Sequence, residues 1–297
     1  MIGGWRAAVT WLLVAEAAYA VMRVATRSAS DAAEVHWAEV ASARFLGGAL
    51  VAVAAARLRG VSLRVVDQRH AWLRSLFGTG GAICLFHALG TSHIAVGDAT
   101  TLYSTTPLWV AVLAGPILKE RVSSGVWAGV ALGFAGVATL MGARWGAGGW
   151  TALLVLVGAV SYAFAILSLR RLSTRESSEA IALHMSLTAG GILGLIALPH
   201  LQPVPSGAWL PIALSALAGG LGQVAVGRAY ARGTAASLAA LGYVGVVITY
   251  LLEVALFRRM PEAHQILGAL LVIAAGVWVA YASRPARAPA EPASAVE

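Results

Sequence analysis

The chain has 297 residues, of which 59% are hydrophobic and 11% are charged, and its net charge is +8. A soluble globular domain usually carries about 25% charged residues, so this composition argues against a water-soluble fold. The positive charge does not point to a nucleic-acid partner, because the arginines stand at the ends of apolar runs, as positive-inside topology requires.

Ten apolar stretches follow one another along the chain, each long enough to cross a bilayer. A helix rises about 1.5 Å per residue, so a hydrocarbon core of about 30 Å needs roughly 20 apolar residues. The predicted spans are Trp5 to Ala25, Trp37 to Ala56, Ala71 to Gly90, Ile94 to Leu118, Ser123 to Met141, Trp150 to Leu169, Ala180 to Leu198, Ala208 to Ala231, Ala235 to Phe257 and Ala263 to Ala282. This order predicts an all-α integral membrane protein with ten transmembrane helices and the lipid bilayer as its surroundings.

The basic residues predict the orientation of these spans. If the N-terminus is cytoplasmic, most arginines fall in the inside segments, such as those from the end of span two to the first residues of span three: Arg57, Arg59, Arg64, Arg69 and Arg74. Because cytoplasmic loops carry the excess of Lys and Arg, both termini are predicted to face the cytoplasm, with the protein in the inner membrane. Residues 284–297, rich in Pro and Ala, are predicted to form a disordered cytoplasmic tail.

The first apolar run has a second interpretation, that of a cleaved signal peptide. It contains Ala18-Tyr19-Ala20, which resembles an A-x-A cleavage site. Glu16 interrupts the run, however, and cleavage would leave nine spans and break the internal repeat described next. We therefore prefer an uncleaved first span.

The two halves of the chain echo each other. One offset aligns Tyr19 with Tyr162 and Gly48 with Gly191, so spans one and two correspond to spans six and seven. Each half has an odd number of spans, so the second half is predicted to cross the membrane with opposite polarity, as in many secondary transporters. The predicted five-helix repeats are residues 1–143 and residues 148–283.

Residues 101–141 combine a proline inside span four, Pro107, with an acid-containing turn and a glycine-rich span five. This segment resembles the EamA-type family of the drug/metabolite transporter superfamily, and Arg44 matches an arginine common in that family's second span. The resemblance extends over nearly the whole chain and implies a secondary transporter. Family members export amino acids, purines, drugs or other metabolites, and some import solutes. The spacing of His93 before Pro107 is similar to that of aromatic amino acid exporters, although Thr106 stands where they tend to have tryptophan.

Two of the predicted spans contain weak points. Pro107 has no N–H to offer the carbonyl of Tyr103, so span four is predicted to kink or unwind with a free acceptor near mid-membrane. In span nine Val246 stands at the position equivalent to Pro107, but Gly242 and Gly245 supply a corresponding weak point. Paired interruptions are the best sequence pointer to a substrate site, and the alternative is an ordinary proline kink used for packing.

Charged residues inside the spans are the next candidates. A charge at the bilayer centre costs at least about 2.5 kcal/mol, so Glu16 should face protein or water, and Tyr19 and Arg23 follow on its helical face. Glu16 is interpreted either as a proton-coupling or amine-binding carboxylate, similar to that of the small multidrug transporters, or as a structural partner of Arg23 or Arg44. Arg44 either binds a substrate carboxylate through its planar fork of donors or holds spans together.

Aromatic and polar residues of the spans complete the predicted site. Tyr19 and Tyr162, at equivalent places in the two halves, are predicted to form opposing aromatic walls. Single histidines such as His87 and His184 have the alternative of a packing role. The predicted substrate-binding residues are Tyr19, His87, His93, Tyr103, Pro107, Tyr162, Gln223, Tyr230 and Tyr243, and the predicted coupling or charge-pair residues are Glu16, Arg23 and Arg44.

No motif predicts a metal, a cofactor or enzymatic chemistry. The single cysteine, Cys84, excludes an internal disulfide and a cysteine metal site, and the glycines of residues 78–81 follow no strand, so they are not a phosphate loop. Gly129 and Gly133 stand in G-x-x-x-G register, which serves packing either within the bundle or between subunits and leaves a monomer or a homodimer open.

We therefore predict a secondary exporter of small metabolites, amino acids first among them, that works by alternating access. The alternatives are a multidrug, purine or other solute transporter, including an importer, a lipid flippase or structural module, and an intramembrane enzyme.

Overall fold

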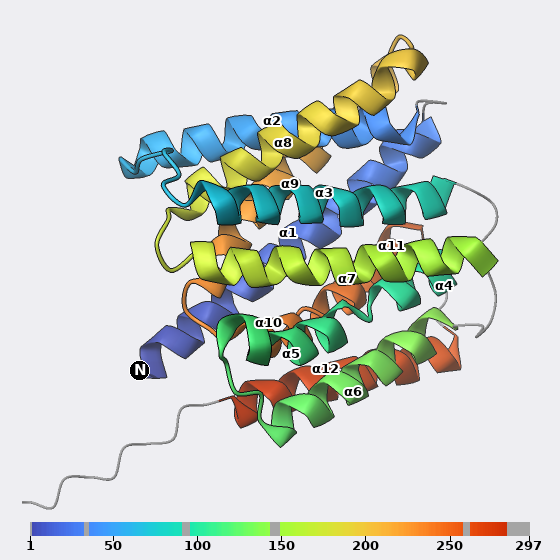
Figure 1. Ribbon diagram of the computed structural model, residues 1–297. Helices are drawn as coiled ribbons and strands as arrows, with labels where there is room; N and C mark the ends of the chain where they lie inside the picture. Colours follow the sequence, from blue (N-terminus) through green and yellow to red (C-terminus); the bar gives the residue numbers. More distant parts are fainter. Residues whose placement is uncertain (1, 33–35, 91–95, 143–148, 258–261, 284–297) are drawn as a thin grey trace, which may run out of the picture.

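The computed structural model describes residues 2–32, 36–90, 96–142, 149–257 and 262–283, and the regular structure of this part of the chain is helical (Figure 1). Its α-helices are α1 (Ile2–Ala32), α2 (Trp37–Arg59), α3 (Gln68–Gly90), α4 (Val96–Tyr103), α5 (Thr106–Leu118), α6 (Ser124–Met141), α7 (Gly149–Leu172), α8 (Ser178–Ala197), α9 (Trp209–Tyr230), α10 (Ala235–Leu241), α11 (Val244–Phe257) and α12 (Ala263–Ala282). Two short 3-10 helices, η1 (Leu198–His200) and η2 (Ser206–Ala208), lie between α8 and α9.

Nine helical segments of the described residues are long and apolar enough to cross a membrane. Two of them are composite, because α4 and α5 together form the segment Ala99–Leu118 and α10 and α11 form Ala235–Leu256. The predicted span that is not among these nine, Ala71 to Gly90, corresponds to α3, which is 23 residues long but contains Arg69, His70 and Arg74. The all-α membrane fold is thus confirmed, whereas the crossing of α3 stays a prediction.

Large apolar side chains cover the outside of the bundle. Leu50, Leu195 and Val277, from three different helices, are 73%, 69% and 67% exposed. Water solvates such surface poorly, whereas the hydrocarbon of a bilayer solvates it well. The outward-facing residues are therefore suited to lipid rather than to water.

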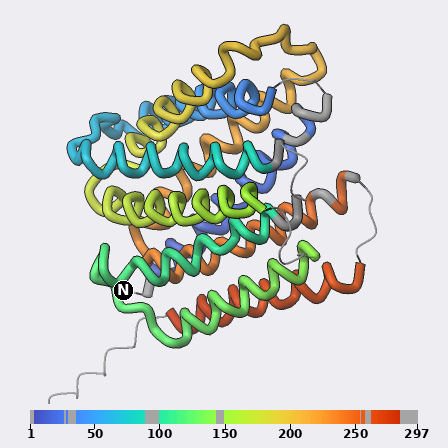
Figure 2. Tube along the Cα trace, turned by 45° about the vertical axis from the view of Figure 1, so that its right-hand side comes forward, coloured from blue at the N-terminus to red at the C-terminus, as the bar shows by residue number. Residues whose placement is uncertain are grey.

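The helices pair in a regular pattern. Figures 1 and 2 show α2 beside α8 at one edge of the bundle and α6 beside α12 at the opposite edge, while α1 packs on α9 and α3 packs on α7 between them. If the two halves are repeats, α1 corresponds to α7, α2 to α8, α3 to α9 and α6 to α12. Exchanging each helix for its counterpart then turns the α1–α9 pair into the α7–α3 pair and leaves both edge pairs unchanged. The contacts therefore have the symmetry expected of an internal repeat.

Glycines let the helices at the α6 edge approach closely. A Cβ atom added to Gly129 would overlap the side chain of Val279 in α12, and one added to Gly133 would overlap the ring of Tyr243. Small residues at such contacts are typical of helix packing in membranes. Of the two roles predicted for the G-x-x-x-G pair, packing within the bundle accounts for both glycines.

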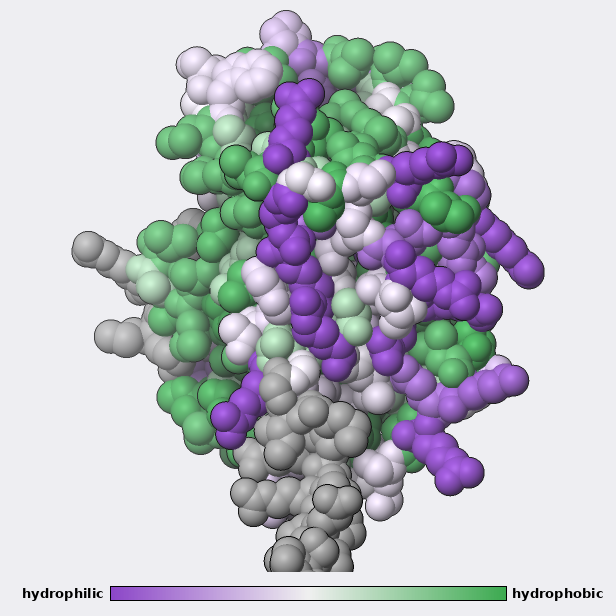
Figure 3. Space-filling view, turned by 90° about the vertical axis from the view of Figure 1, so that its left-hand side faces the viewer, coloured by the Kyte–Doolittle hydropathy of each residue, from purple (hydrophilic) through white to green (hydrophobic). Residues whose placement is uncertain are grey.

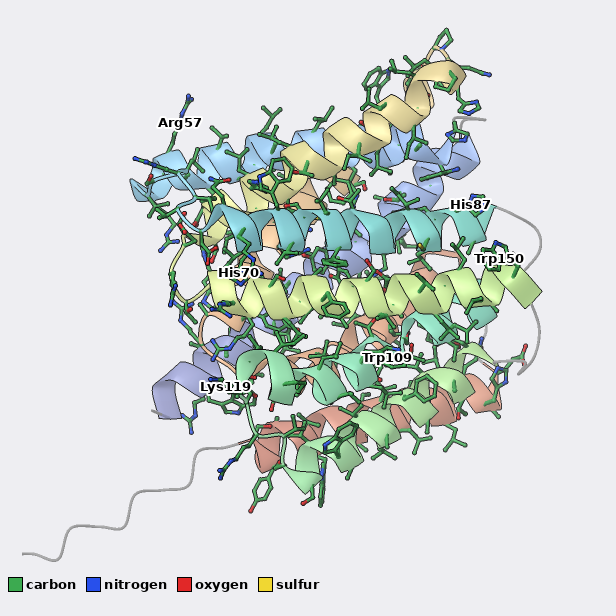
Figure 4. All side chains as sticks on the ribbon, in the orientation of Figure 1. Arg57, His70, His87, Trp109, Lys119 and Trp150 are labelled. Carbon is green, nitrogen blue, oxygen red and sulfur yellow. The ribbon has the colours of Figure 1, made fainter. Side chains whose placement is uncertain are left out.

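The connections after α2, α5, α7 and α9 lie at one end of the bundle, together with the start of α1 and the end of α12 (Figure 1). Figure 3 shows the hydrophilic side chains gathered there, and Figure 4 marks this end with Arg57 and Lys119. Its exposed cations are Arg6, Arg57, Arg59, Arg64, Arg69, Lys119, Arg121, Arg171, Arg175 and Arg232. We call this the basic end; its assignment to the cytoplasm is a prediction from the positive-inside rule.

Local sequence signals start and stop the helices at the basic end. Gly60 ends α2 with a left-handed backbone (φ of 63°), a conformation that glycine adopts without strain. The hydroxyls of Ser123 and Ser177 cap α6 and α8 by accepting backbone N–H groups of their first turns. Ser177 also donates to the carbonyl of Ser62 at 2.8 Å, which fastens the α2–α3 connection to the start of α8.

Candidate functional site

Two of the membrane-crossing segments are interrupted in their middle. The first half-helix α4 stops at Tyr103, and α5 restarts at Thr106 with Pro107 in its first turn. In the other half of the chain, α10 stops at Leu241 and α11 restarts at Val244. The paired interruptions predicted in spans four and nine are therefore present in the structure.

The free carbonyl predicted at the first interruption is not free. The Thr106 hydroxyl donates to the carbonyl of Tyr103 at 2.8 Å, and the Thr105 hydroxyl donates to the carbonyl of Leu102 at 2.7 Å. Thr106 also approaches the carbonyl of Ala159 in α7 at 3.3 Å. The Thr106 hydroxyl thus replaces the backbone donor that Pro107 lacks, as neighbouring hydroxyls do in other membrane helices.

Glu16 of α1 lies directly against the second interruption. A Cβ atom added to Gly245 would overlap the Glu16 carboxylate, and one added to Gly242 would lie 3.5 Å from its Oε1 atom. The two glycines predicted as a weak point therefore also make room for a carboxylate. The side chain of Glu16 is 12% exposed, so it lies in the interior of the bundle.

Arg23, two turns further along α1, joins the same interruption. Its Nη2 atom lies 3.4 Å from Glu16 Oε2, and its Nη1 atom donates to the carbonyl of Gly245 at 3.2 Å and to the hydroxyl of Thr249 at 2.7 Å. Of the two partners considered for Glu16, the structure therefore provides Arg23 and not Arg44. The pair links α1 to α11 across the two halves.

Four of the predicted tyrosines lie near one another inside the bundle. Tyr19 and Tyr230 belong to one buried cluster, against which Tyr162 packs, and the rings of Tyr162 and Tyr103 lie 5.8 Å apart. The hydroxyl of Tyr19 is buried and makes no hydrogen bond within the described residues. Tyr243 lies in a separate cluster against α6.

Arg74 is buried, which the sequence analysis did not predict. It had been counted with the arginines of the α2–α3 connection, but it is only 2% exposed. Its Nη2 atom donates to Gln223 Oε1 at 3.3 Å, its Nη1 atom approaches the sulfur of Met185 at 3.6 Å, and its Nε atom has no partner among the described residues. The signal was present, because Arg74 stands inside the predicted span that begins at Ala71.

Arg44 is the second buried arginine, with 7% of its surface exposed. Its guanidinium lies 3.8 Å from the centre of the Phe45 ring and contacts the sulfur of Met22, and its Nε atom has no partner within the described residues. Neither Glu16 nor a backbone carbonyl is a partner of Arg44 among the described residues, so both roles considered for Arg44, substrate binding and holding spans together, stay predictions.

Helix α9 brings these groups together. The Arg44 side chain lies beside Gly219, the Tyr19 ring lies on Gly222, and Arg74 contacts Gln223, so all three meet α9 within little more than one turn. We call Glu16, Tyr19, Arg23, Arg44, Arg74 and Gln223 the central polar cluster. Its members come from α1, α2, α3 and α9. Within it Glu16 pairs with Arg23, whereas Arg44 and Arg74 have no ion-pair partner among the described residues, which is costly for buried charges.

Other predicted residues do not join this cluster. His87 is exposed at the end of α3 opposite the basic end (Figure 4), so it does not lie among the other predicted substrate-binding residues. His184 bonds the hydroxyl of Ser75 at 2.8 Å, as the packing alternative expects. His93 lies outside the described residues.

Ion pairs close the basic end. Glu179 of α8 is 1% exposed and lies 2.8 Å from Arg59 of α2 and 2.6 Å from Arg228 of α9. Glu120, in the turn after α5, accepts a hydrogen bond from Arg170 of α7 at 2.9 Å and from the first N–H of α10 at 2.8 Å. Both carboxylates join helices of the first half to helices of the second.

A comparison with known protein families decides the identity. A model of the EamA-like transporter family matches the chain twice, over residues 6–142 and residues 149–281. The chain belongs to the EamA-like transporter family. This protein is therefore a multi-pass membrane transporter with a small-molecule substrate, and its relatives bear transporter and exporter names.

Similar proteins of known name handle different solutes. The chain is 30% identical over 64% of its length to a riboflavin transporter of Rhizobium johnstonii, and this match covers 63% of that protein, somewhat less than two thirds of its length. It is 24% identical over 89% of its length to the pseudopaline exporter CntI of Pseudomonas aeruginosa, of which it covers 92%. A solved crystal structure resembles this EamA-like transporter with a TM-score of 0.81 at 22% identity, over 93% of this chain and 97% of that one, which shows the fold.

Proposed function

We propose that this EamA-like transporter exports small metabolites, amino acids first among them, across the inner membrane by alternating access. In this proposal residues 1–143 and 148–283 are inverted repeats, ten spans cross the membrane, and both termini and the basic end face the cytoplasm. The symmetric helix pairing and the two family matches support the repeats. The exposed cations of the basic end support the orientation.

The observation that carries the proposal is the meeting of an interrupted helix with a buried charged group. Glu16 lies against the break between α10 and α11, and tyrosines from both halves lie nearby. Ionisable groups inside a membrane are costly and mark substrate or ion pathways, and interrupted helices mark the substrate sites of secondary transporters. A bundle built only for structure would have no use for this combination.

The chemistry of the cluster suits an amino acid. A carboxylate at Glu16 is able to attract an ammonium group, buried guanidiniums attract a carboxylate, and the rings of Tyr19, Tyr103 and Tyr162 offer apolar area with polar tips to the side chain. These groups perform no bond-making step in the proposal, so the protein acts as a carrier and not as an enzyme.

Counterflow in proteoliposomes tests the proposal. Vesicles containing the purified protein and loaded with unlabelled L-phenylalanine should accumulate radiolabelled L-phenylalanine from outside, and protein-free vesicles should not. Accumulation of radiolabelled riboflavin but of no amino acid would replace the proposed substrate with the one named for the riboflavin transporters. Chemical alteration of the label would point to an enzyme, and absence of all flux would refute the transport of these solutes.

A further inference from the structure

Arg74 is a buried cation for which the described residues supply no acid. It lies beside the neutral amide of Gln223, whose Nε2 donor has no partner among the described residues. We propose that Arg74 and Gln223 form a subsite for a carboxylate of the transported solute, so that the solute is recognised by its carboxylate more than by an amine. This inference rests on the proposed function, because it assigns part of the same transport site.

The surroundings of Arg74 leave most of its donors unused. A guanidinium carries five N–H donors in one plane, and the described contacts are a 3.3 Å hydrogen bond to Gln223 Oε1 and a 3.6 Å contact with the Met185 sulfur. The Nε atom is buried and has no partner among the described residues. A buried charge is strongly unfavourable unless it is paired, so the site is incomplete as it stands.

The charges of the central polar cluster do not balance. Glu16 is the acid of this cluster, and its Oε2 atom already lies 3.4 Å from Arg23. Glu179, the fully buried carboxylate of the basic end, contacts Arg59 and Arg228 instead. Arg74 and Arg44 are therefore left without an ion pair in the described part of the chain, and the excess of positive charge favours an anionic solute group.

The shape around Arg74 fits a planar carboxylate. A Cβ atom added to Gly78, one turn along α3, would lie only 2.5 Å from Arg74 Nη1, so this glycine makes room for the guanidinium to lie against α3. Gln223 uses its oxygen to accept from Arg74, which leaves its amide Nε2 able to donate. The ring of Tyr19 packs on the adjacent Gly222, and the hydroxyl of Tyr19 has no partner among the described residues. Two guanidinium donors and an amide donor would occupy three of the roughly four lone-pair positions of a carboxylate.

The subsite has a defined depth. Arg74 stands six residues after the first residue of α3, and Gln223 stands seven residues before the last residue of α9, both measured from the basic end. At about 1.5 Å per residue, this places the subsite roughly 10 Å inside that end, next to the tyrosines. A solute that binds its carboxylate there would lay its body against Tyr19 and Tyr162.

The test uses three compounds that differ only in their charged groups: L-phenylalanine, 3-phenylpropionate, which lacks the amine, and phenethylamine, which lacks the carboxylate. Purified full-length protein in detergent is titrated with each, and the saturable rise in Tm gives an apparent Kd. We expect L-phenylalanine and 3-phenylpropionate to stabilise the wild type and phenethylamine to have little effect. The reverse order, or no saturable shift with either carboxylate, would overturn the subsite.

Variants assign the effect to Arg74. Arg74→Gln should raise the apparent Kd of 3-phenylpropionate at least tenfold, and Gln223→Leu, which keeps the arginine, should raise it by a smaller factor. Arg64→Gln removes an exposed arginine of the same end and should leave the Kd unchanged. If Arg74→Gln does not fold, Gln223→Leu carries the comparison, and an unchanged Kd in whichever variant folds refutes the proposal.

The outcome is separable from that of the proposed function. Counterflow by the wild type decides whether the protein carries the solute, whereas the Kd ratios decide which side chain binds its carboxylate. Flux with unchanged Kd values would leave the transporter standing and remove the subsite.

Discussion

Replacing Glu179 with alanine should destabilise the protein far more than replacing its partner Arg59. Glu179 is 1% exposed and accepts from Arg228, whose side chain is 17% exposed and whose buried Nε atom has no partner in the part of the chain that the structure describes. Removing one partner of a buried pair typically costs about 3–5 kcal/mol, because the other charge is left uncompensated. Arg59 is 51% exposed, so its loss should cost only about 0–1 kcal/mol.

Thermal unfolding in detergent measures the difference. For a chain of this size 1 kcal/mol corresponds to about 2 °C in Tm, so Glu179→Ala should lower Tm by roughly 6–10 °C and Arg59→Ala by about 2 °C at most. The double variant Glu179→Ala/Arg228→Ala should recover part of the loss, since it also removes the stranded cation. Equal shifts for Glu179→Ala and Arg59→Ala would refute the reasoning that burial of Arg228 sets the cost.

Three further predictions concern packing, coupling and orientation. Gly129→Ala should destabilise the α6–α12 contact by about 1–3 kcal/mol through overpacking, whereas Gly191→Ala, where an added Cβ would meet no atom within 4 Å, should be neutral or slightly stabilising in the same Tm assay. Glu16→Gln should abolish any dependence of flux on an imposed pH gradient, and an unchanged dependence would reject proton coupling at this residue. Cysteines placed at Arg64 and at Gly207 should react with a membrane-impermeant maleimide from the cytoplasmic and the outer side respectively, and the opposite labelling would invert the topology.

The sequence predicted the interruptions well because they have a covalent cause. Proline cannot donate a backbone hydrogen bond wherever it stands, so Pro107 marked the break between α4 and α5 without any knowledge of the tertiary structure. The glycines at positions 242 and 245 marked the other break because glycine loses more conformational freedom in a helix than other residues do, which destabilises the helix there. The composition and the apolar runs likewise fixed the fold class, which follows from the solvent rather than from particular contacts.

The partners of the charged and polar groups were harder to predict, because they depend on how helices rotate about their axes. The Tyr103 carbonyl accepts a hydrogen bond from the hydroxyl of Thr106, and this bond depends on the Thr106 rotamer, which the sequence does not predict. The exposure of His87 likewise depends on how α3 is placed in the bundle, which the residues of that helix alone do not give. Arg74 was missed because hydropathy gives span boundaries only to within a few residues, so an arginine just after the predicted start of span three was grouped with the connection before it.

The charge of the cluster has a consequence for the direction of transport. Moving one elementary charge through a membrane potential is worth about 2.3 kcal/mol per 100 mV, and a cell interior is negative. A carboxylate anion bound at Arg74 and released outward would be driven by this potential alone, whereas a zwitterion carries no net charge and needs a second gradient. In proteoliposomes with an imposed potassium diffusion potential, efflux of 3-phenylpropionate should therefore quicken when the interior is negative, and Glu16→Gln should retain that response. A flux of 3-phenylpropionate that ignores the potential would mean that a compensating cation crosses with it, and Glu16, paired with Arg23 at the break in α11, would then be the residue to examine for that role.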